Sequence, residues 1–140
     1  MESKNNRTDP ILKTGKLNDP ERKRALIVDD ETDICYLLSN ILKQKNIQTV
    51  FAGSLAEADR MLQSSKFFYY VFLDNHLPDG LGINQIKRWK DKFPSLHVIM
   101  ITAHDSYEER RKASNDGAES FISKPFSKEV ILNSIVPPSA

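Results

Sequence analysis

Residues 24–52 read RALIVDDETDICYLLSNILKQKNIQTVFA and contain a strand-helix-strand pattern. A short apolar run, Ala25–Val28, precedes a stretch whose apolar residues recur at helical spacing, and a second run, Ile47–Ala52, follows it. Short runs of this kind, rich in β-branched or aromatic residues, are typical of strands buried on both faces. Two such strands joined by a helix predict a βαβ unit with parallel strands and a right-handed crossover.

The alternation continues along the chain. Three more apolar runs lie at Phe67–Leu73, Leu96–Ile101 and Glu119–Ile122. The intervening stretches carry apolar stripes at helical spacing, which are Ile34, Leu37, Leu38, Ile41 and Leu42, then Leu55, Ala58, Met61 and Leu62, then Ile83, Ile86, Trp89 and Phe93. Five strands alternating with helices predict a doubly wound (βα)5 domain of the α/β class, with a five-stranded parallel sheet as the middle of three layers.

Local signals mark several helix ends. Ser54, followed three residues later by Glu57, forms a capping-box pattern. Gly117 stands where a left-handed C-terminal cap of the fourth helix is expected. Thr102 is a candidate cap for that same helix, which we expect to start near Asp105.

Length and composition suit one such domain and exclude several other classes. The chain has 140 residues and a single cysteine, so it has neither an intrachain disulfide nor a Cys-rich zinc site. With 20 basic and 19 acidic residues, the net charge of +1 gives no global reason to bind nucleic acid or an anionic membrane. No apolar run approaches the ~20 residues of a membrane span, and the polar N-terminus does not look like a signal peptide. We therefore expect a cytoplasmic protein.

The charge is unevenly distributed along the chain. Residues 1–24 carry seven basic and four acidic side chains, whereas the remaining residues carry 13 basic and 15 acidic ones. The first segment has few apolar residues, so its burial does not offset the entropy cost of ordering it. We expect a flexible polar arm over residues 1–23, a folded domain over residues 24–136, and a short tail over residues 137–140 that begins with two prolines.

Polar side chains follow four of the five predicted strands. Asp29 and Asp30 follow the first strand, Asp74 the third, Thr102 the fourth and Lys124 the fifth. Ligands of an open parallel sheet bind beyond the carboxyl ends of its strands, so these groups are expected to converge at one edge. The second run ends without such a group, which places that strand to one side.

This set of side chains suits the transfer of a phosphoryl group. Three carboxylates in one crevice repel one another unless a cation lies between them, and hard oxygen ligands favour Mg²⁺. The Lys124 ammonium and the Thr102 hydroxyl are suited to anionic oxygens. A central carboxylate is able to act as the nucleophile and form an acyl phosphate.

Taken together, these residues resemble the receiver domain of two-component response regulators. The matching motifs are Asp29-Asp30, Asp74, Leu-Pro-Asp-Gly at 77–80, Thr-Ala at 102–103 and Lys-Pro-Phe at 124–126. Each motif alone is weak, but their joint order, spacing and placement at strand ends are specific. The resemblance covers about residues 24–136 and implies the flavodoxin-like version of the doubly wound fold.

The resemblance implies a role for each acidic residue. Asp74 would receive a phosphoryl group from a phosphohistidine of a sensor histidine kinase or of a histidine phosphotransfer protein. Asp30 and Asp74 would ligate Mg²⁺ directly, the backbone carbonyl of His76 would be a third protein ligand, and Asp29 would act partly through water. A receiver promotes its own phosphorylation and dephosphorylation and is not a turnover enzyme.

Further roles follow from the same resemblance. Thr102 and Lys124 would bind the phosphoryl oxygens, and Phe121 would be the switching aromatic that turns inward when Thr102 moves. A plain core position for Phe121 is equally open. The Lys124–Pro125 bond is usually cis in this family. A downstream protein partner would bind the face made by the fourth helix, the fifth strand and the fifth helix, with no contact of this chain to nucleic acid or membrane.

The three histidines and the cysteine receive separate interpretations. His76 and His104 occupy positions that tune phosphate lifetime in receivers, and we hypothesise that they make dephosphorylation pH-dependent near neutrality. The alternative is that both are loop histidines without a special role. His97, inside an apolar run, is interpreted as structural, and Cys35 as a partly buried, unreactive thiol.

Two other functions are weighed against the receiver. One is a phosphate-ester hydrolase with an aspartyl nucleophile, but the second acid of its Asp-x-Asp pattern is replaced by His76, and a cap domain is absent from the sequence. The other is a phosphate-independent interaction module, which loss of Asp30, Asp74 or Lys124 would favour, although all three are present. Only Glu129–Ala140 follow Lys128, so we expect either a stand-alone receiver or a fragment of a longer regulator or hybrid kinase.

Overall fold

The fold is described here from a computed structural model of residues 22–64 and 66–135. The predicted arm over residues 1–23 lies outside the described residues except for its last two, and the predicted tail over residues 137–140 lies wholly outside them. The three domain boundaries therefore stay predictions.

Five parallel strands form the central sheet. They are β1 (Arg24–Val28), β2 (Gln48–Ala52), β3 (Tyr70–Asp74), β6 (His97–Thr102) and β7 (Ser120–Ser123). Their order across the sheet is β2-β1-β3-β6-β7, so β3 is the middle strand and β2 lies at an edge, as expected. The predicted doubly wound, flavodoxin-like fold is confirmed.

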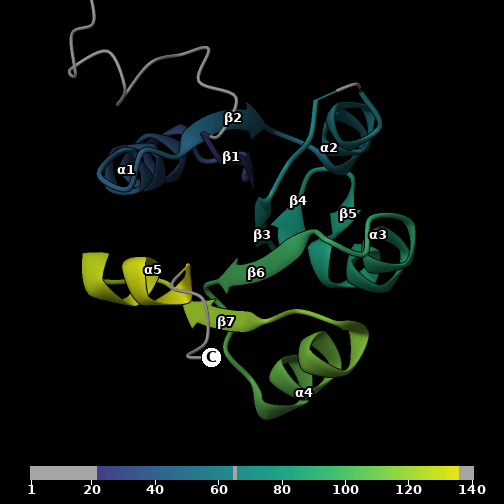
Figure 1. The fold of residues 1–140 in the computed structure, drawn as a ribbon. Coiled ribbons are helices and arrows are strands. Elements are labelled where there is room, and N and C mark those ends of the chain that lie inside the picture. The colour runs from purple at the N-terminus through teal and green to yellow at the C-terminus, as the bar shows by residue number, and fades with distance from the viewer. Residues whose placement is uncertain (1–21, 65, 136–140) are drawn as a thin grey trace, which may run out of the picture.

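Helices cover both faces of this sheet (Figure 1). Helices α1 (Thr32–Lys43) and α5 (Lys128–Ser134) lie on one face. The other face is covered by α2 (Leu55–Leu62), α3 (Ile86–Lys92), which extends a 3-10 turn at Gly82–Gln85, and α4 (Tyr107–Asp116). The molecule therefore has the three layers expected from the sequence.

The sheet separates two apolar cores. Along β3, Val71 and Leu73 pack with the side chains of α2 and α3, whereas Tyr70 and Phe72 pack with those of α1 and α5. Successive side chains of a strand point to opposite faces, so a strand between two helix layers needs apolar residues at nearly every position. This requirement explains why the strands appear in the sequence as unbroken apolar runs.

The predicted helix caps are confirmed with one exception. The Ser54 hydroxyl accepts a hydrogen bond from the Glu57 amide at 3.1 Å, and Gly117 ends α4 with a φ of 114°. Thr102 does not cap α4, because the N-cap residue of that helix is Ser106. The Thr102 hydroxyl instead accepts a hydrogen bond from the His104 amide at 3.1 Å. The cap expectation for Thr102 was wrong because the β6–α4 loop is longer than the pattern indicates.

Two other expectations are corrected. Strand β3 begins at Tyr70 rather than at Phe67, and the Phe67 side chain is exposed. On α1, Cys35 is buried, whereas Leu37 of the predicted stripe is exposed. The apolar face of α1 is rotated relative to the stripe, because its buried positions run Cys35, Leu38, Ile41 and Leu42.

Candidate functional site

Asp74 ends the middle strand of the sheet and is almost fully buried. The residue is 7% exposed, and β1 and β6 lie on either side of β3. The first strand delivers Asp29, β6 ends in Thr102, and β7 leads directly to Lys124. The convergence of these four residues at the carboxyl edge follows from the parallel strand order and agrees with the sequence prediction.

Lys124 connects three carboxylates at this edge. Its Nζ lies 3.0 Å from Asp29 Oδ2, 3.0 Å from Glu31 Oε1 and 3.4 Å from Asp74 Oδ1. Burial lowers the pKa of Lys124, but the hydrogen bonds to Glu31 and Asp29 outweigh burial and raise it. The peptide bond that follows Lys124 is cis, as the resemblance implied. Glu31 was not among the predicted site residues; its place directly after the Asp29-Asp30 pair was the available signal.

The environment of Asp74 disfavours its charged form. Burial raises the pKa of the Asp74 carboxyl most, the nearby Asp29 charge raises it further, and Lys124 partly opposes both. Water is thus largely replaced around this carboxylate by one ammonium and one like charge. A further cation beside this carboxylate would stabilise its charged form more strongly than the same cation would in water.

The acidic residues at this edge fit a hard divalent cation. Asp29, Asp30 and Asp74 each offer an oxygen, and these oxygens lie within 4.8 Å of one another. Asp29 and Asp74 are buried, whereas Asp30 is exposed, so the group opens toward solvent at Asp30. Mg²⁺ prefers one or two carboxylates together with water and phosphate oxygens, and this donor set matches that preference.

The loop after β3 folds back against the site. The Gly82 amide donates to the Asn75 carbonyl at 2.8 Å, and the Ile83 amide donates to the Asn75 side-chain oxygen at 2.9 Å. A side chain at Gly82 would collide with the backbone carbonyl of Asp74. The Leu-Pro-Asp-Gly stretch forms a small hairpin of β4 (His76–Leu77) and β5 (Gly80–Leu81), which the sequence did not predict.

Asp79, in the turn of this hairpin, binds the start of helix α2. Its carboxylate accepts a hydrogen bond from the Leu55 amide at 2.9 Å and another from the Ala56 amide at 3.0 Å. These two bonds lower the pKa of Asp79. The hairpin that follows β3 is thereby connected to helix α2.

Phe121 is half-buried and lies beneath an arginine. The ring packs against the core on the α2–α4 side, and the Arg110 guanidinium carbon lies 4.8 Å from its centroid. Asp105 pairs with Arg110 and accepts a hydrogen bond from the Ser123 hydroxyl. Hydrogen bonds from Arg110 and Ser123 lower the pKa of Asp105 to about 2. The ring thus has both core contacts and a solvent-side contact, which suits either interpretation of Phe121.

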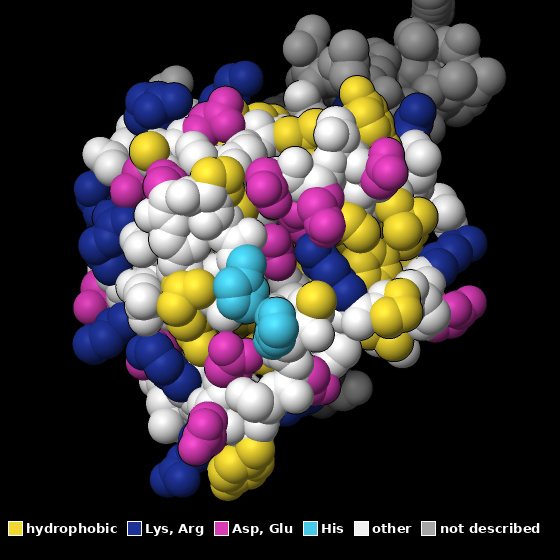
Figure 2. All heavy atoms as spheres, turned by 180° about the vertical axis from the view of Figure 1, so that it is seen from behind, with side chains coloured by type: hydrophobic (Ala, Val, Ile, Leu, Met, Phe, Trp, Pro, Cys, Tyr) yellow, Lys and Arg dark blue, Asp and Glu magenta, His cyan; other side chains and the backbone are white. Residues whose placement is uncertain are grey.

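His76 and His104 are brought together beside the acidic group. Their ring centroids are 4.7 Å apart, with the ring planes inclined by 60°. Figure 2 shows two touching histidine side chains next to several acidic ones and a basic one. His97 lies at the other end of β6, where its Nδ1 is 2.6 Å from the Glu119 carboxylate.

The family model for the response regulator receiver domain matches residues 25–136. This chain belongs to that family. A receiver relative is the response regulator protein PilR of Pseudomonas aeruginosa, 38% identical over 104 residues, which are 74% of this chain and 23% of PilR. The probable transcriptional regulatory protein TcrX of Mycobacterium tuberculosis is 34% identical over 77% of this chain and 46% of TcrX. The match thus spans 23% of the length of PilR and 46% of that of TcrX, less than half of either relative.

Solved receiver structures agree with the fold. The beryllofluoride-activated NtrC4 receiver domain dimer is 40% identical, with a TM-score of 0.76, and the match covers 80% of this chain and 92% of that one. A CheY-like receiver from Methanospirillum hungatei is 30% identical, with a TM-score of 0.76, covering 82% and 91%. The receiver resemblance recognised in the sequence is therefore confirmed.

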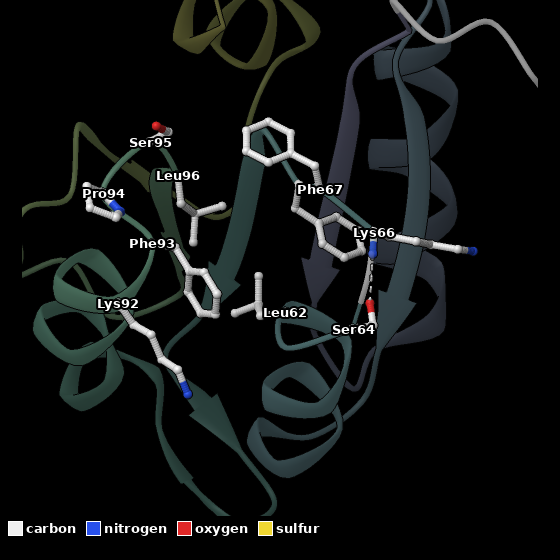
Figure 3. Close-up of a pocket in the computed structure, with 10 residues that line it drawn as sticks. Leu62, Ser64, Lys66, Phe67, Lys92, Phe93, Pro94, Ser95 and Leu96 are labelled. Atoms are coloured by element: carbon white, nitrogen blue, oxygen red, sulfur yellow. Dashed lines mark hydrogen bonds between the residues drawn. The ribbon is translucent and has the colours of Figure 1, made fainter.

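A cavity of about 360 Å³ lies apart from the acidic group, where β3 and β6 begin. Leu62 and Phe93 face each other across it (Figure 3). The cavity is thus at the opposite end of β3 from Asp74.

Among the helices of residues 22–64 and 66–135, none has both the length and the apolar character needed to cross a membrane.

Proposed function

We propose that this receiver is a phosphoacceptor switch in which Asp74 takes a phosphoryl group from a phosphohistidine. The single observation that carries the proposal is the contact of Lys124 with Asp29 and Asp74 at the end of the middle strand. One oxygen of Asp74 forms the new P–O bond as the P–N bond of phosphohistidine breaks, and the ring, which carries a proton on its other nitrogen, leaves as neutral imidazole. The donor is a histidine kinase or a histidine phosphotransfer protein.

The chain's own residues would position and stabilise this transfer. The Lys124 ammonium, already 3.4 Å from Asp74, neutralises charge that develops on the phosphoryl oxygens. Thr102, fully buried at the end of the neighbouring strand, offers its hydroxyl to the same oxygens. His76 and His104, beside the acceptor, are proposed to tune how long the acyl phosphate lasts.

Mg²⁺ is the proposed cofactor. Asp30 and Asp74 would hold it directly, together with the backbone carbonyl of His76, and Asp29 would hold it partly through water; the spacing of the three carboxylates supports this assignment. When bound, the ion supplies positive charge that offsets the repulsion between acceptor and donor.

The output of the switch is proposed to be a change of surface. Movement of Thr102 toward the phosphoryl group leaves space for Phe121 to turn inward, which alters the surface made by α4, β7 and α5. A downstream protein would read that surface, whereas this chain would contact neither nucleic acid nor membrane. We propose further that the protein acts in the cytoplasm. We also propose that it is a switch and not a turnover enzyme.

Labelling with a small phosphodonor tests the proposal. Incubation with acetyl phosphate and Mg²⁺ should add one phosphoryl group per chain, detected by intact mass and reversed by hydroxylamine, as expected of an acyl phosphate. Asp74→Asn should abolish this label, as should EDTA. Asp91→Asn is the matched control, because Asp91 is an exposed carboxylate that pairs with Lys87. Unchanged labelling of Asp74→Asn would place the nucleophile elsewhere and overturn the proposal.

A further inference from the structure

We propose that His76 and His104 form a two-imidazole site for a borderline-soft divalent ion, with Zn²⁺ as the ion that fits best. The ligands would be the two imidazole rings, whereas Mg²⁺ would be held by the carboxylates and the His76 backbone carbonyl, so the two sites would select different classes of metal. Water or another small oxygen ligand would complete the coordination. The proposal does not depend on phosphorylation of Asp74.

The spacing of the two rings matches shared coordination. Zn²⁺ binds histidine nitrogen at about 2.0–2.1 Å in tetrahedral geometry, which puts the centroids of two liganding imidazoles about 5 Å apart. The centroids of His76 and His104 are 4.7 Å apart, and the planes are inclined by 60° rather than stacked. Both side chains are exposed, so an ion can reach them from solvent.

Both histidines stand on backbone that hydrogen bonds hold in place. His76 is in strand β4, paired with Leu81 of β5, and its neighbour Asn75 accepts two amide hydrogen bonds from the returning chain. The His104 amide donates to the buried Thr102 hydroxyl at 3.1 Å. Because the supporting segments are already ordered, binding would cost little beyond the freedom of two rings.

The local charge attracts cations to this point. Asp29, Asp30, Glu31 and Asp74 carry four negative charges against the one positive charge of Lys124, a local net of −3 that would remain negative, at −1, with Mg²⁺ bound. His76 follows Asp74 by two residues, a chain span of at most about 7 Å, which is within the Debye length of about 8 Å at physiological ionic strength.

The two sites differ in ligand chemistry. Imidazole nitrogen suits Zn²⁺, whereas Mg²⁺ prefers the oxygen ligands of the carboxylate group. The sequence contains three histidines, and the third, His97, is bonded to Glu119 at the opposite end of β6. The single cysteine, Cys35, is buried, and burial followed by the Asp29 charge raises the pKa of its thiol to about 11. It therefore does not compete as a thiolate ligand.

Calorimetric titration of Zn²⁺ into tag-free protein, with saturating Mg²⁺ present throughout, tests the proposal. We expect one Zn²⁺ per chain, and an affinity at least about tenfold lower in His76→Ala and in His104→Ala. His97→Ala is the matched control and should bind as wild type does. Asp30→Asn should lose the stabilisation by Mg²⁺ but keep the Zn²⁺ site.

A second measurement needs no substitution. The electron paramagnetic resonance spectrum of one equivalent of Cu²⁺ on the wild-type protein should show coupling to two imidazole nitrogens. Equal Zn²⁺ affinity in the double variant His76→Ala/His104→Ala, or a Cu²⁺ spectrum with oxygen ligands alone, would overturn the proposal. Loss of Zn²⁺ binding in Asp30→Asn, with binding intact in both histidine variants, would assign the ion to the carboxylates instead.

Discussion

The Lys124 ammonium lies 3.0 Å from the Asp29 carboxylate, although the two residues are 95 positions apart in the chain. Both side chains are largely removed from water, with 13% and 3% of their surfaces exposed. The same ammonium is the counter-ion of Asp74. Lys124, which follows β7, thus links the carboxyl ends of β1, β3 and β7.

Removing this lysine should destabilise the domain. In Lys124→Met, Asp29 and Asp74 remain buried without their counter-ion, and breaking a buried ion pair of this kind costs about 3 kcal/mol or more. The loss is measurable as a lower free energy of unfolding in urea at pH 7. In a Lys124→Met/Asp29→Asn double variant, part of the loss should return because one unpaired charge is gone. A single variant as stable as wild type would contradict this account of the site.

Mg²⁺ should raise the melting temperature. As proposed, the ion would bind the folded arrangement of Asp29, Asp30 and Asp74 and not the unfolded chain, so at about five times its Kd it would add about 1 kcal/mol. For a domain of this size that corresponds to a shift of roughly 3–5 °C, readable by thermal denaturation. Asp30→Asn should reduce the shift, while Asp33→Asn, an exposed carboxylate on α1, should not. A melting temperature indifferent to Mg²⁺ and EDTA would count against the ion.

A methyl group at Gly82 should be costly. In Gly82→Ala the new Cβ would press on the Asp74 backbone carbonyl and the Leu73 side chain, so the loop after β3 must move. Overpacking of this type costs about 1–3 kcal/mol. Gly53→Ala is the matched control, since the nearest atom to a Cβ there is a flexible Glu57 oxygen at 3.9 Å. Equal unfolding free energies for the two variants would disprove the close approach.

Asp79 should stabilise the domain only where it is ionised. Its folded pKa is lowered by the Leu55 and Ala56 amides, so its contribution is present above the unfolded pKa of about 3.9 and is lost as pH falls through the lower folded pKa. Asp79→Ala should therefore melt at a lower temperature than wild type at pH 7, and the difference should shrink toward pH 3. A difference that is the same at both pH values would mean that the charge of Asp79 plays no part.

Most of the fold was predictable because its signals are local. The apolar runs indicated the five strands, and the residues after them indicated which groups meet at the carboxyl edge, since parallel strands end together. The positions of Asp29, Asp74, Thr102 and Lys124 followed from this rule alone. Matching the motifs to a family required their joint order along the chain.

Other features depend on how separate segments of the chain pack together. Glu31 reaches Lys124, and Asp79 reaches the start of α2, across 93 and 24 positions of sequence. The pairing of Arg110 with Asp105 over Phe121 likewise depends on how α4 packs against β7. The buried residues of α1 follow helical spacing, and packing against the sheet decides that the face carrying Cys35, and not the one carrying Leu37, is the buried one. These contacts arise only when the layers assemble.

The alternation of side chains across the sheet divides the functional residues between its two sides. In β3, Asp74 alternates with the residues around it so that it is on the same face of the sheet as Tyr70 and Phe72, which face α1 and α5. In β6, Thr102 is on the same face as Val98 and Met100, which face α2, α3 and α4. Phe121 of β7 is paired with Met100 and is on that second face too. Asp74, the proposed acceptor, thus lies on the opposite face of the sheet from Thr102 and Phe121, the two proposed switch residues. A signal that begins with the proposed phosphorylation of Asp74 would therefore have to cross from one face of the sheet to the other. Asp74 and Thr102 both lie at the edge where the strands end, so the signal would cross there.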